Sequence, residues 1–464
     1  MASYEQVKQK LTEHGQGHLL DFYDSLDAEK KQILLNNVKD LNLARINQIF
    51  KTATSAKPSS KNVSPLPKDA FDSTLYDAHK TKSWYDKGGQ GTRLGSSDPK
   101  GCYNIQLPSG KSLFQLQGER ILKLAQKLTS EKVVIPWYVM TSGPTRAATE
   151  AFFISHNYFG LEKSNVFFFN QGVLPAFTFE GKIFLESKES PAFSPDGNGG
   201  IYAALKSEGV IADLEKRKIP YIHAYCVDNC LVKVPDPVFV GYCVEKNADC
   251  GAKSIPKKNP DEAVGVICLR DGKPSVVEYS EIDPEMSRSR DASGALIYNA
   301  ANIANHFYTT EFLKKIEKFE HLLEYHIAKK KIKHINAEGV EIKPESSNGI
   351  KLELFIFDVF PFTERFAVLE CARKDEFSPL KNAPGSKDGD SPDTSRADIM
   401  AQHVRFIEAA GGKVVSEDGS APVFEISPLV SFAGEGLEAA KGKTYKSPKY
   451  VIINHRLIKT VADL

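Results

Sequence analysis

The sequence lacks the features that mark several large classes of protein. It has no apolar run near the roughly 18 residues needed to span a bilayer, and residues 1–11 are polar and show no signal-peptide core. Sixty Lys and Arg residues against 59 Asp and Glu leave a net charge near zero. This balance gives no general electrostatic reason to expect nucleic acid or an anionic membrane as a partner.

Cysteine and histidine are poorly spaced for metal binding. The seven cysteines form no C-x-x-C pair, and we expect them to be buried, reduced thiols of a cytoplasmic protein. The 11 histidines are scattered. His321 and His326 are five residues apart, so they would not share one face of a helix. A zinc site is therefore not expected.

The most informative feature that is present is a glycine-rich stretch at residues 88–95 (GGQGTRLG), followed by Pro99 and Lys100. Glycines let the backbone turn tightly and bring its N–H groups against phosphate oxygens. Arg93 and Lys100 can neutralise a triphosphate. The spacing is not that of a G-x-G-x-x-G fingerprint, and no Gly-Lys-Ser/Thr closes a Walker A loop. The stretch predicts a nucleoside triphosphate bound in another way, with a glycine-rich surface turn as the alternative.

Hydrophobic spacing predicts an α/β protein. The chain of 464 residues is too long for one ordinary hydrophobic core, so we expect two or three domains. The N-terminal 50 residues show helical spacing, with Asp27 as a helix cap, and the next stretch, 55–68, has the composition of a linker. Buried parallel strands are predicted at 133–140, 166–169 and 221–227, with a helix at 113–128. Polar residues directly after such strands lie at the edge of the sheet where ligands bind.

The second half predicts a further set of elements. Strands are expected at 264–269, 275–279 and 352–357, a helical block at 304–332, a polar loop at 381–395, and short strands at 413–415 and 450–454. We therefore expect three parts in the chain. They are an N-terminal helical region with a linker (1–83), a central domain (84–378) and a small C-terminal domain (379–464).

Six further motifs, in order along the chain, carry a resemblance to a known family. They are residues 169–172 (FNQG), 194–202 (SPDGNGGIY), 225–229 (YCVDN), 277–281 (VEYSE), 302–307 (NIANHF) and 377–382 (FSPLKN). With the glycine stretch, they make the chain closely resemble the eukaryotic UDP-N-acetylhexosamine (UDP-N-acetylglucosamine) pyrophosphorylases. The resemblance implies an α/β, Rossmann-like nucleotidyltransferase (GT-A-like) central domain with a mixed sheet, a helical N-terminal region and a small C-terminal α+β domain.

The resemblance also implies an enzyme that joins UTP and N-acetylglucosamine 1-phosphate into UDP-N-acetylglucosamine and pyrophosphate by direct in-line attack. Such a transfer needs positioning, cations and usually Mg²⁺ or Mn²⁺ rather than a protein nucleophile. The same chemistry on N-acetylgalactosamine 1-phosphate or glucose 1-phosphate is an alternative. A non-catalytic UDP-sugar-binding protein is another. The expected partners are these small substrates, with no nucleic acid and no membrane.

The roles that the resemblance implies also suit the chemistry of the residues. Three cations, Arg93, Lys100 and Lys381, would contact the phosphates and the departing pyrophosphate. Asp228 would bind the metal ion, although an Asx cap after a strand is the simpler explanation of that residue. The nucleotide-binding residues would be Gly88, Gly89, Gly91 and Thr92 of the phosphate loop, with Gln171, Gly197 and Asn198 at the uracil edge.

The resemblance implies a sugar site made of five residues: Gly265, Glu278, Asn302, Phe355 and Phe357. Gly265 would allow a close approach of the backbone, and Phe355 and Phe357 would form a wall of the N-acetyl pocket. Two phenylalanines that alternate on a strand are as readily explained as core residues.

Two features depart from the family pattern. Ala301 stands where the family usually has glycine. More seriously, the residues before Gly88, 83–87 (SWYDK), are too short and too polar to be the apolar central strand that the family has directly before the glycine loop. The sequence therefore lacks the apolar central strand at this position. We expect that residues are missing from the sequence; if the sequence is instead complete, we expect the protein to fold poorly and to show little activity.

Overall fold

The computed structural model describes residues 3–55, 62–67, 70–73, 92–95, 99–127 and 133–451. They form two compact units. Unit 1 is made of Met1–Lys61, Gln171–Ala204 and Glu317–Val359, and unit 2 of Asn62–Asn170, Leu205–Ile316 and Phe360–Leu464. The three-part domain division expected from the sequence stays a prediction.

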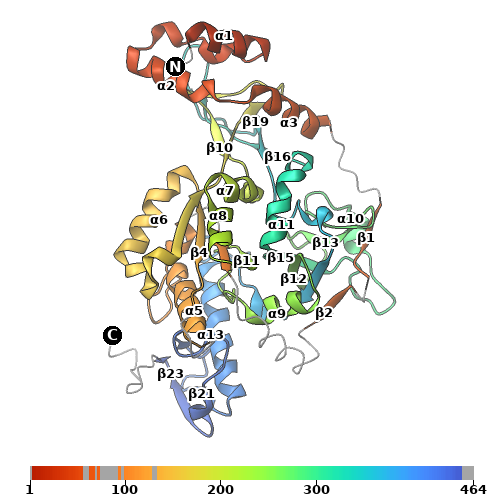
Figure 1. Ribbon diagram of the computed structural model, residues 1–464. Coiled ribbons are helices and arrows are strands. Elements are labelled where there is room, and N and C mark those ends of the chain that lie inside the picture. Colours follow the sequence, from red (N-terminus) through yellow and green to blue (C-terminus); the bar gives the residue numbers. More distant parts are fainter. Residues whose placement is uncertain are drawn as a thin grey trace. The chain divides into compact units, whose positions relative to one another are not determined.

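Unit 1 begins with three helices, α1 (Tyr4–Glu13), α2 (Ala28–Lys39) and α3 (Leu43–Ser55), drawn in red in Figure 1. The predicted cap is confirmed, because the Lys30 N–H donates to Asp27 Oδ1 over 2.8 Å at the start of α2. Apolar side chains of these helices, Leu11 and Leu34 among them, share one core with Phe177 and Leu352. Segments far apart in the sequence are thus joined into one unit.

The strands of unit 1 form four small antiparallel sheets, with the orders β10-β6, β16-β19-β7, β17-β18 and β8-β9. Their bounds are β6 (Val173–Pro175), β7 (Phe177–Thr178), β8 (Leu185–Ser187), β9 (Ser190–Pro191), β10 (Phe193–Pro195), β16 (His326–Lys330), β17 (His334–Ile335), β18 (Glu341–Ile342) and β19 (Gly349–Glu353).

Unit 2 is built around a mixed sheet that has 11 strands in the described part of the chain, with the main order β2-β20-β12-β15-β11-β3-β4-β5. The strand β13 lies off this main path and pairs with β1, β14 and β15. The bounds are β1 (Val63–Pro65), β2 (Phe71–Ser73), β3 (Thr92–Gly95), β4 (Trp137–Thr141), β5 (Val166–Asn170), β11 (Tyr221–Tyr225), β12 (Cys250–Pro256), β13 (Val266–Arg270), β14 (Lys273–Val277), β15 (Ala300–Thr309) and β20 (Phe366–Glu370).

Helices surround this sheet, and α5 (Leu113–Lys127) and α6 (Gly143–Ser155) lie beside β4 in Figure 1. The others are α7 (Ile201–Ser207), which the unit boundary divides, α8 (Val210–Lys216), α9 (Pro237–Glu245), α10 (Pro284–Arg288), α11 (Thr310–Lys315), α12 (Arg373–Glu376) and α13 (Pro392–Ala409). After α13 come the short parallel pairs β21 (Lys413–Ser416) with β23 (Thr444–Ser447), and β22 (Phe424–Ile426) with β24 (Lys449–Val451).

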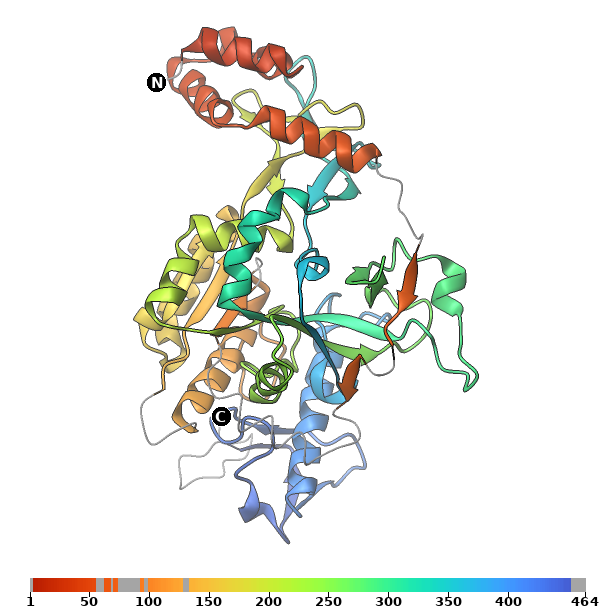
Figure 2. The same ribbon diagram turned by 45° about the vertical axis from the view of Figure 1, so that its right-hand side comes forward.

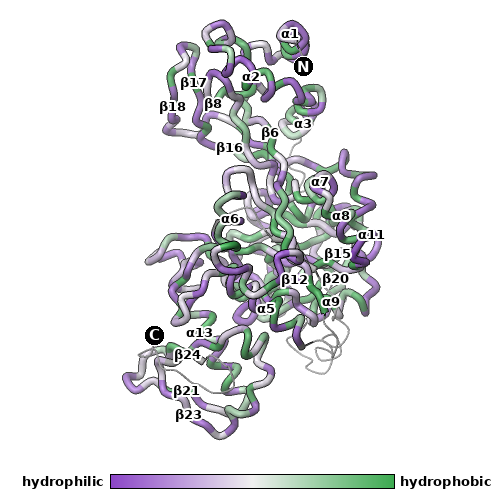
Figure 3. The backbone as a smooth tube through the Cα atoms, turned by 60° about the vertical axis from the view of Figure 1, so that its left-hand side comes forward, coloured by the Kyte–Doolittle hydropathy of each residue, from purple (hydrophilic) through white to green (hydrophobic). Residues whose placement is uncertain are grey.

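The core of unit 2 explains why the apolar runs form strands. Trp137 and Val139 of β4 are fully buried and pack with Phe114 of α5 and Phe153 of α6. Figure 3 shows the same apolar character as green stretches around β20. All seven cysteines are free thiols, most of them buried. Within the described residues, no helix has the length and apolar character needed to traverse a bilayer.

Several predicted elements are confirmed. The helix expected at 113–128 is α5, and the runs at 166–169 and 221–227 contain β5 and β11. The run at 133–140 forms β4 only in its second part. Pairing of β4 with β5 is parallel, as predicted. The strand β3, which was not predicted, pairs in parallel with both β11 and β4. The antiparallel strand β15 makes the sheet mixed, and Figure 2 shows it as one long teal arrow.

Two predicted elements are wrong. The block 304–332 is not helical throughout, because β15 extends to Thr309, only Thr310–Lys315 is α-helix and His326–Lys330 is the strand β16. Its neighbours β11 and β12 lie on both sides of β15 and override the local helical spacing. The strand expected at 352–357 ends at Glu353, so Phe355 and Phe357 do not alternate on a strand.

The expected gap in the sheet is filled. The strand β3, made of Thr92–Gly95, lies between β11 and β4 and pairs in parallel with both. In register, Arg93 stands opposite His223 on one side and Trp137 on the other. The residues that fill this gap come from the glycine stretch itself. Residues 83–87 lie outside the described part of the chain, so the expectation that an apolar strand is missing before Gly88 stays a prediction.

Candidate active site

The phosphate end of the site is built where β11 ends in unit 2. Asp228 follows β11 by three residues, and Lys100 lies on the 3₁₀ turn Pro99–Cys102. The Lys100 Nζ is 3.6 Å from Asp228 Oδ2, and both side chains are partly exposed. The structure thus brings together two residues that the sequence placed 128 positions apart, at the edge of the sheet where ligands of α/β folds bind.

Lys381 is held next to the same carboxylate. The Leu380 N–H donates to the Asp228 carbonyl over 2.9 Å, and the Cys230 N–H donates to the Ser378 carbonyl over 2.9 Å. These bonds form a short antiparallel bridge that carries Lys381 to the phosphate end. Burial raises the pKa of Asp228, and the positive charges of Lys100 and Lys381 act against that shift.

A metal ion fits this arrangement only together with the substrate. No group of three or more His, Cys, Asp or Glu side chains that could hold a metal occurs in the described parts of the chain. Mg²⁺ commonly takes one or two carboxylates and completes its shell with waters and phosphate oxygens. The 3.6 Å distance to Lys100 is longer than a charge-assisted hydrogen bond of about 2.7–2.9 Å. Asp228 therefore keeps acceptor capacity for a cation.

In unit 1, Gln171 presents an unused acceptor. Its side chain is 6% exposed, and Oε1 is a buried atom with no hydrogen-bond partner in the described part of the chain. Its Nε2 faces Asp196 Oδ1 at 3.5 Å and the Gly197 carbonyl at 3.4 Å, which fixes the orientation of the amide. A buried acceptor without a donor is costly. The uracil N3–H is a donor of the right kind for it.

The loop after β10 is shaped by its glycines. Gly197 has φ +89°, and a Cβ there would collide with the Leu354 carbonyl oxygen, so only glycine suits the position. The Asn198 Oδ1 accepts from the Ile356 N–H over 2.9 Å. The Asn198 side chain is thus partly engaged with its own unit, and Gly197 offers backbone groups beside Gln171.

The predicted sugar residues Gly265, Glu278 and Asn302 converge in unit 2. Val266 pairs with both Val277 and Ala301, so the register places Gly265 opposite Glu278 on one side and Asn302 on the other. The Asn302 N–H donates to the Gly265 carbonyl over 2.8 Å. A Cβ at Gly265 would lie 2.6 Å from Glu278 Oε1, so glycine makes room for that carboxylate.

Asn302 is oriented by residues that the sequence analysis did not single out. Its Oδ1 lies 3.0 Å from His306 Nε2 and accepts from the Ala304 N–H over 3.2 Å. The Tyr308 hydroxyl is 3.2 Å from His306 Nδ1. Ala304 has φ +49°, a left-handed conformation that is rare for alanine. It lies where the β12–β15 pairing is irregular, between Ala252 and Ser254.

Phe355 and Phe357 lie in unit 1, as do Gln171, Gly197 and Asn198, the residues predicted to contact uracil. Their rings are 5.2 Å apart, and His326 stacks against Phe355 at 4.4 Å. Phe355 is half-buried and Phe357 is buried. This aromatic group lies in the loop after β19, and its place in the sugar site stays a prediction.

Part of the glycine stretch lies outside the described residues, namely Gly88, Gly89 and Gly91. Thr92 and Arg93 are in β3. Their predicted roles at the phosphates stay predictions.

Asp196 and His306 are the residues that the sequence analysis missed. Both lie inside motifs of the resemblance, 194–202 and 302–307, but nothing in their local spacing shows that they orient Gln171 and Asn302. Such roles depend on side chains that meet only after folding.

Comparison with known proteins now decides the family. Residues 85–432 match the family described as UTP–glucose-1-phosphate uridylyltransferase. The chain belongs to this family. It is 43% identical to the human UDP-N-acetylhexosamine pyrophosphorylase-like protein 1, with 97% of each chain covered. It is also 43% identical to the UDP-N-acetylglucosamine pyrophosphorylase of Saccharomyces cerevisiae, over 95% of this chain and 98% of that one.

Solved structures agree with this assignment. The Trypanosoma brucei UDP-N-acetylglucosamine pyrophosphorylase, in complex with an inhibitor, superposes with a TM-score of 0.81 at 30% identity over 95% of each chain. A putative pyrophosphorylase from Entamoeba histolytica gives 0.76 at 33% identity, over 84% of this chain and 100% of that one. The expected nucleotidyltransferase fold, the enzyme class and the family resemblance are confirmed.

The alignment with the human relative is longer than this chain. It runs over 492 residues, which is more than the 464 residues of this chain. The relative therefore has residues without a counterpart here.

Proposed function

We propose that this uridylyltransferase joins UTP and N-acetylglucosamine 1-phosphate to give UDP-N-acetylglucosamine and pyrophosphate. The proposal rests mainly on one observation: Gly265 lies between Glu278 and Asn302, opposite each of them in the strand register. A carboxylate and an amide side by side can accept from and donate to the hydroxyl and N-acetyl groups of a sugar. The names of the relatives point to the same substrate.

The chemistry follows from charge and position. A phosphate oxygen of the sugar 1-phosphate attacks the α-phosphorus of UTP, the bond from that phosphorus to the bridging oxygen breaks, and pyrophosphate leaves with the electron pair. In unit 2, Lys100 and Lys381 place positive charge where the leaving group gains negative charge. In unit 1, Gln171 and Gly197 offer polar groups that match the edge of uracil. Asp228 would hold Mg²⁺ or Mn²⁺, which would neutralise phosphate charge. No side chain forms a covalent bond.

The test is pyrophosphate release by the purified protein with UTP and each sugar phosphate in turn. We expect the highest kcat/KM with N-acetylglucosamine 1-phosphate, lower values with N-acetylgalactosamine 1-phosphate and the lowest with glucose 1-phosphate. Glucose 1-phosphate as the best substrate would overturn the assignment to an N-acetyl sugar.

A second candidate, a protein that binds UDP-sugar without turnover, has one observation in its favour. The strand β3 is formed by Thr92–Gly95, so part of the glycine stretch is used to complete the sheet. Calorimetric titration with UDP-N-acetylglucosamine, together with the pyrophosphate-release assay, decides between the candidates. Binding without any pyrophosphate release would support this second function.

A further inference from the structure

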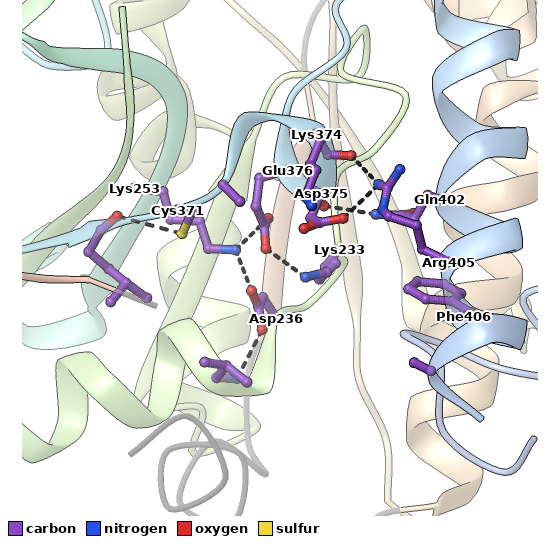
Figure 4. Close-up of a pocket in the computed structure, with 14 residues that line it drawn as sticks. Lys233, Asp236, Lys253, Cys371, Lys374, Asp375, Glu376, Gln402, Arg405 and Phe406 are labelled. Carbon is purple, nitrogen blue, oxygen red and sulfur yellow. Dashed lines mark hydrogen bonds and ion pairs between the residues drawn. The ribbon is translucent and has the colours of Figure 1, made fainter. Parts of the chain in front are cut away.

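Four charged side chains lie together in unit 2, as Figure 4 shows. Lys253 Nζ contacts Asp236 and is 2.8 Å from Glu376 Oε2, and Lys233 Nζ is 2.7 Å from Glu376 Oε1. The Lys253 side chain is only 1% exposed. We call Lys233, Asp236, Lys253 and Glu376 the buried charge cluster.

The cluster is one wall of a cavity of about 370 Å³. Cys371, Arg405 and Phe406 also line this cavity (Figure 4). Within the described part of the chain, the buried charges of the lining already meet opposite charges of the protein. The cavity therefore gives no reason to expect a bound ion, and the role of the cluster lies in the chain that it holds.

Stability alone does not explain such a cluster. Removing paired charges from water costs about as much as their attraction returns, and apolar residues of similar volume often stabilise a fold equally well. A buried ion pair does fix geometry, because each charge is strongly unfavourable unless its partner stays in place. The cluster therefore restrains the position of Glu376 on α12.

Asn229 connects Glu376 to the phosphate end of the site. Its side chain is 2% exposed, and Nδ2 donates to the Glu376 carbonyl over 2.7 Å. Its Oδ1 accepts from the Ser378 N–H over 3.0 Å. One buried amide thus ties both ends of residues 376–378 to the residue directly after Asp228.

This link reaches both charged groups of the phosphate end. The backbone bridge from Leu380 to Asp228 follows directly, with a bond of 2.9 Å, and Lys381 is the next residue. A shift of residues 376–380 would therefore move Lys381 relative to Asp228. Misplacement of a catalytic group by about 1 Å can cost on the order of 10²-fold in rate.

We propose that Asn229 and the buried charge cluster are positioning residues, which hold residues 376–381 against 228–230 so that Asp228 and Lys381 meet the same phosphates. This inference rests on the proposed function and names a part of the site that binds no substrate itself.

The first test compares Asn229→Ala with a matched control, Asn348→Ala. Asn348 makes the same kinds of bond to backbone, with Nδ2 3.0 Å from the Ile332 carbonyl and Oδ1 2.7 Å from the Ile332 N–H, but it belongs to unit 1. We expect Asn229→Ala to lower kcat at least tenfold and to raise the KM for UTP at least fivefold, while the KM for the sugar 1-phosphate changes less than threefold. The control should keep the wild-type kcat. A kcat for Asn229→Ala within twofold of wild type would overturn the proposal.

A second variant addresses the cluster without leaving a lone charge. Lys253→Met combined with Asp236→Asn removes one positive and one negative charge and keeps Glu376 paired with Lys233 over 2.7 Å. We expect the same loss of kcat with the KM for the sugar 1-phosphate retained. Circular dichroism checks that the variant is folded. A folded double variant with wild-type kcat would show that the cluster has no positioning role.

Binding of Mn²⁺ with UTP, measured by calorimetry, separates this inference from the proposed function. We expect Asn229→Ala to bind Mn²⁺–UTP at least fivefold more weakly than wild type and Asn348→Ala to bind it equally well. This comparison does not need turnover. If wild type releases no pyrophosphate, the proposed function fails. The ratio of the two binding constants for Mn²⁺–UTP still tests the positioning role. Equal binding by wild type and Asn229→Ala would reject that role.

Discussion

His306 Nε2 lies 3.0 Å from Asn302 Oδ1 inside the sheet of unit 2. Burial lowers the pKa of His306 to about 3, so the ring is neutral at physiological pH. Because Asn302 Oδ1 is an acceptor, Nε2 carries the proton and donates it, and the Tyr308 hydroxyl donates to Nδ1. With Oδ1 engaged, Asn302 offers its Nδ2 hydrogens to a ligand.

The first prediction concerns this pair. His306→Leu should raise the KM for the sugar 1-phosphate about tenfold, since one hydrogen bond is worth about 1–1.5 kcal/mol, and leave the KM for UTP unchanged. His306→Gln can still donate a hydrogen and should lie closer to wild type. Steady-state kinetics with each substrate varied in turn measure both values. Equal changes in the two KM values would mean that His306 does not act through the sugar.

The second prediction concerns the space beside Glu278. Gly265→Ala puts a Cβ 2.6 Å from Glu278 Oε1 and 2.8 Å from Val276 Cγ1, so the carboxylate has to move. We expect kcat/KM for the sugar 1-phosphate to fall about tenfold or more, as for a lost hydrogen bond of about 1.5–3 kcal/mol to a charged group. Gly143→Ala is the control, since nothing lies within 4 Å of its added Cβ. Equal activity of the two variants would contradict the packing argument.

The third prediction concerns Asp228. Asp228→Asn keeps the shape of the side chain but loses the charge that attracts a divalent cation. We expect the rate at saturating Mg²⁺ to fall on the order of 10²-fold or more, with the melting temperature little changed because the pair with Lys100 is partly exposed. Asp261→Asn is a suitable control, because Asp261 forms a surface ion pair with Arg288 at 2.8 Å. If the rate of Asp228→Asn depends on Mg²⁺ as the wild-type rate does, the cation binds elsewhere.

The fourth prediction concerns acid stability. Burial lowers the pKa of both His306 and His403 to about 3, below the ordinary value of 6.5. The unfolded chain then binds more protons than the folded one between these values, so stability is present above pH 6.5 and is lost as the pH falls toward 3. Each histidine should lower the free energy of unfolding by up to about 1.4 kcal/mol for each unit by which the pH falls.

Urea unfolding at pH 7 and pH 5 measures this loss. His403→Gln should flatten the dependence, whereas replacement of an exposed histidine, His321→Gln, should leave it as in wild type. A free energy of unfolding that is equal at the two pH values would show that the buried histidines do not set acid stability.

The sequence allowed parts of the fold to be predicted where local and long-range preferences agree. The strands β5 and β11 are rich in apolar residues, and α5 has helical spacing. Their neighbours in the parallel part of the sheet favour the same conformations. The prediction failed at 304–309, where pairing with β11 and β12 overrides local spacing. The family resemblance pointed to Gly265, Glu278 and Asn302, and the strand register brings them together.

Other parts of the site could not be predicted from sequence. Glu376 meets Lys253 and Lys233, which are 123 and 143 positions away, and no local pattern marks that meeting. The orientation of Gln171 depends on Asp196, 25 positions further on. Contacts of this kind arise only from the packing of complete elements.

The last prediction tests the strand β3, whose central residue Leu94 stands opposite Ala224 of β11 and Tyr138 of β4. A strand with neighbours on both sides cannot accept proline, which has no N–H to donate and a fixed φ. If residues 92–95 complete the sheet, Leu94→Pro should lower the free energy of unfolding by about 3 kcal/mol or more, or prevent folding. Lys387→Pro, in an exposed turn, is the control and should change stability little. Thermal unfolding followed by circular dichroism measures both variants. If Leu94→Pro melts at the wild-type temperature, residues 92–95 are not a central strand. The glycine stretch would then be free to bind phosphate, which would favour turnover over binding alone.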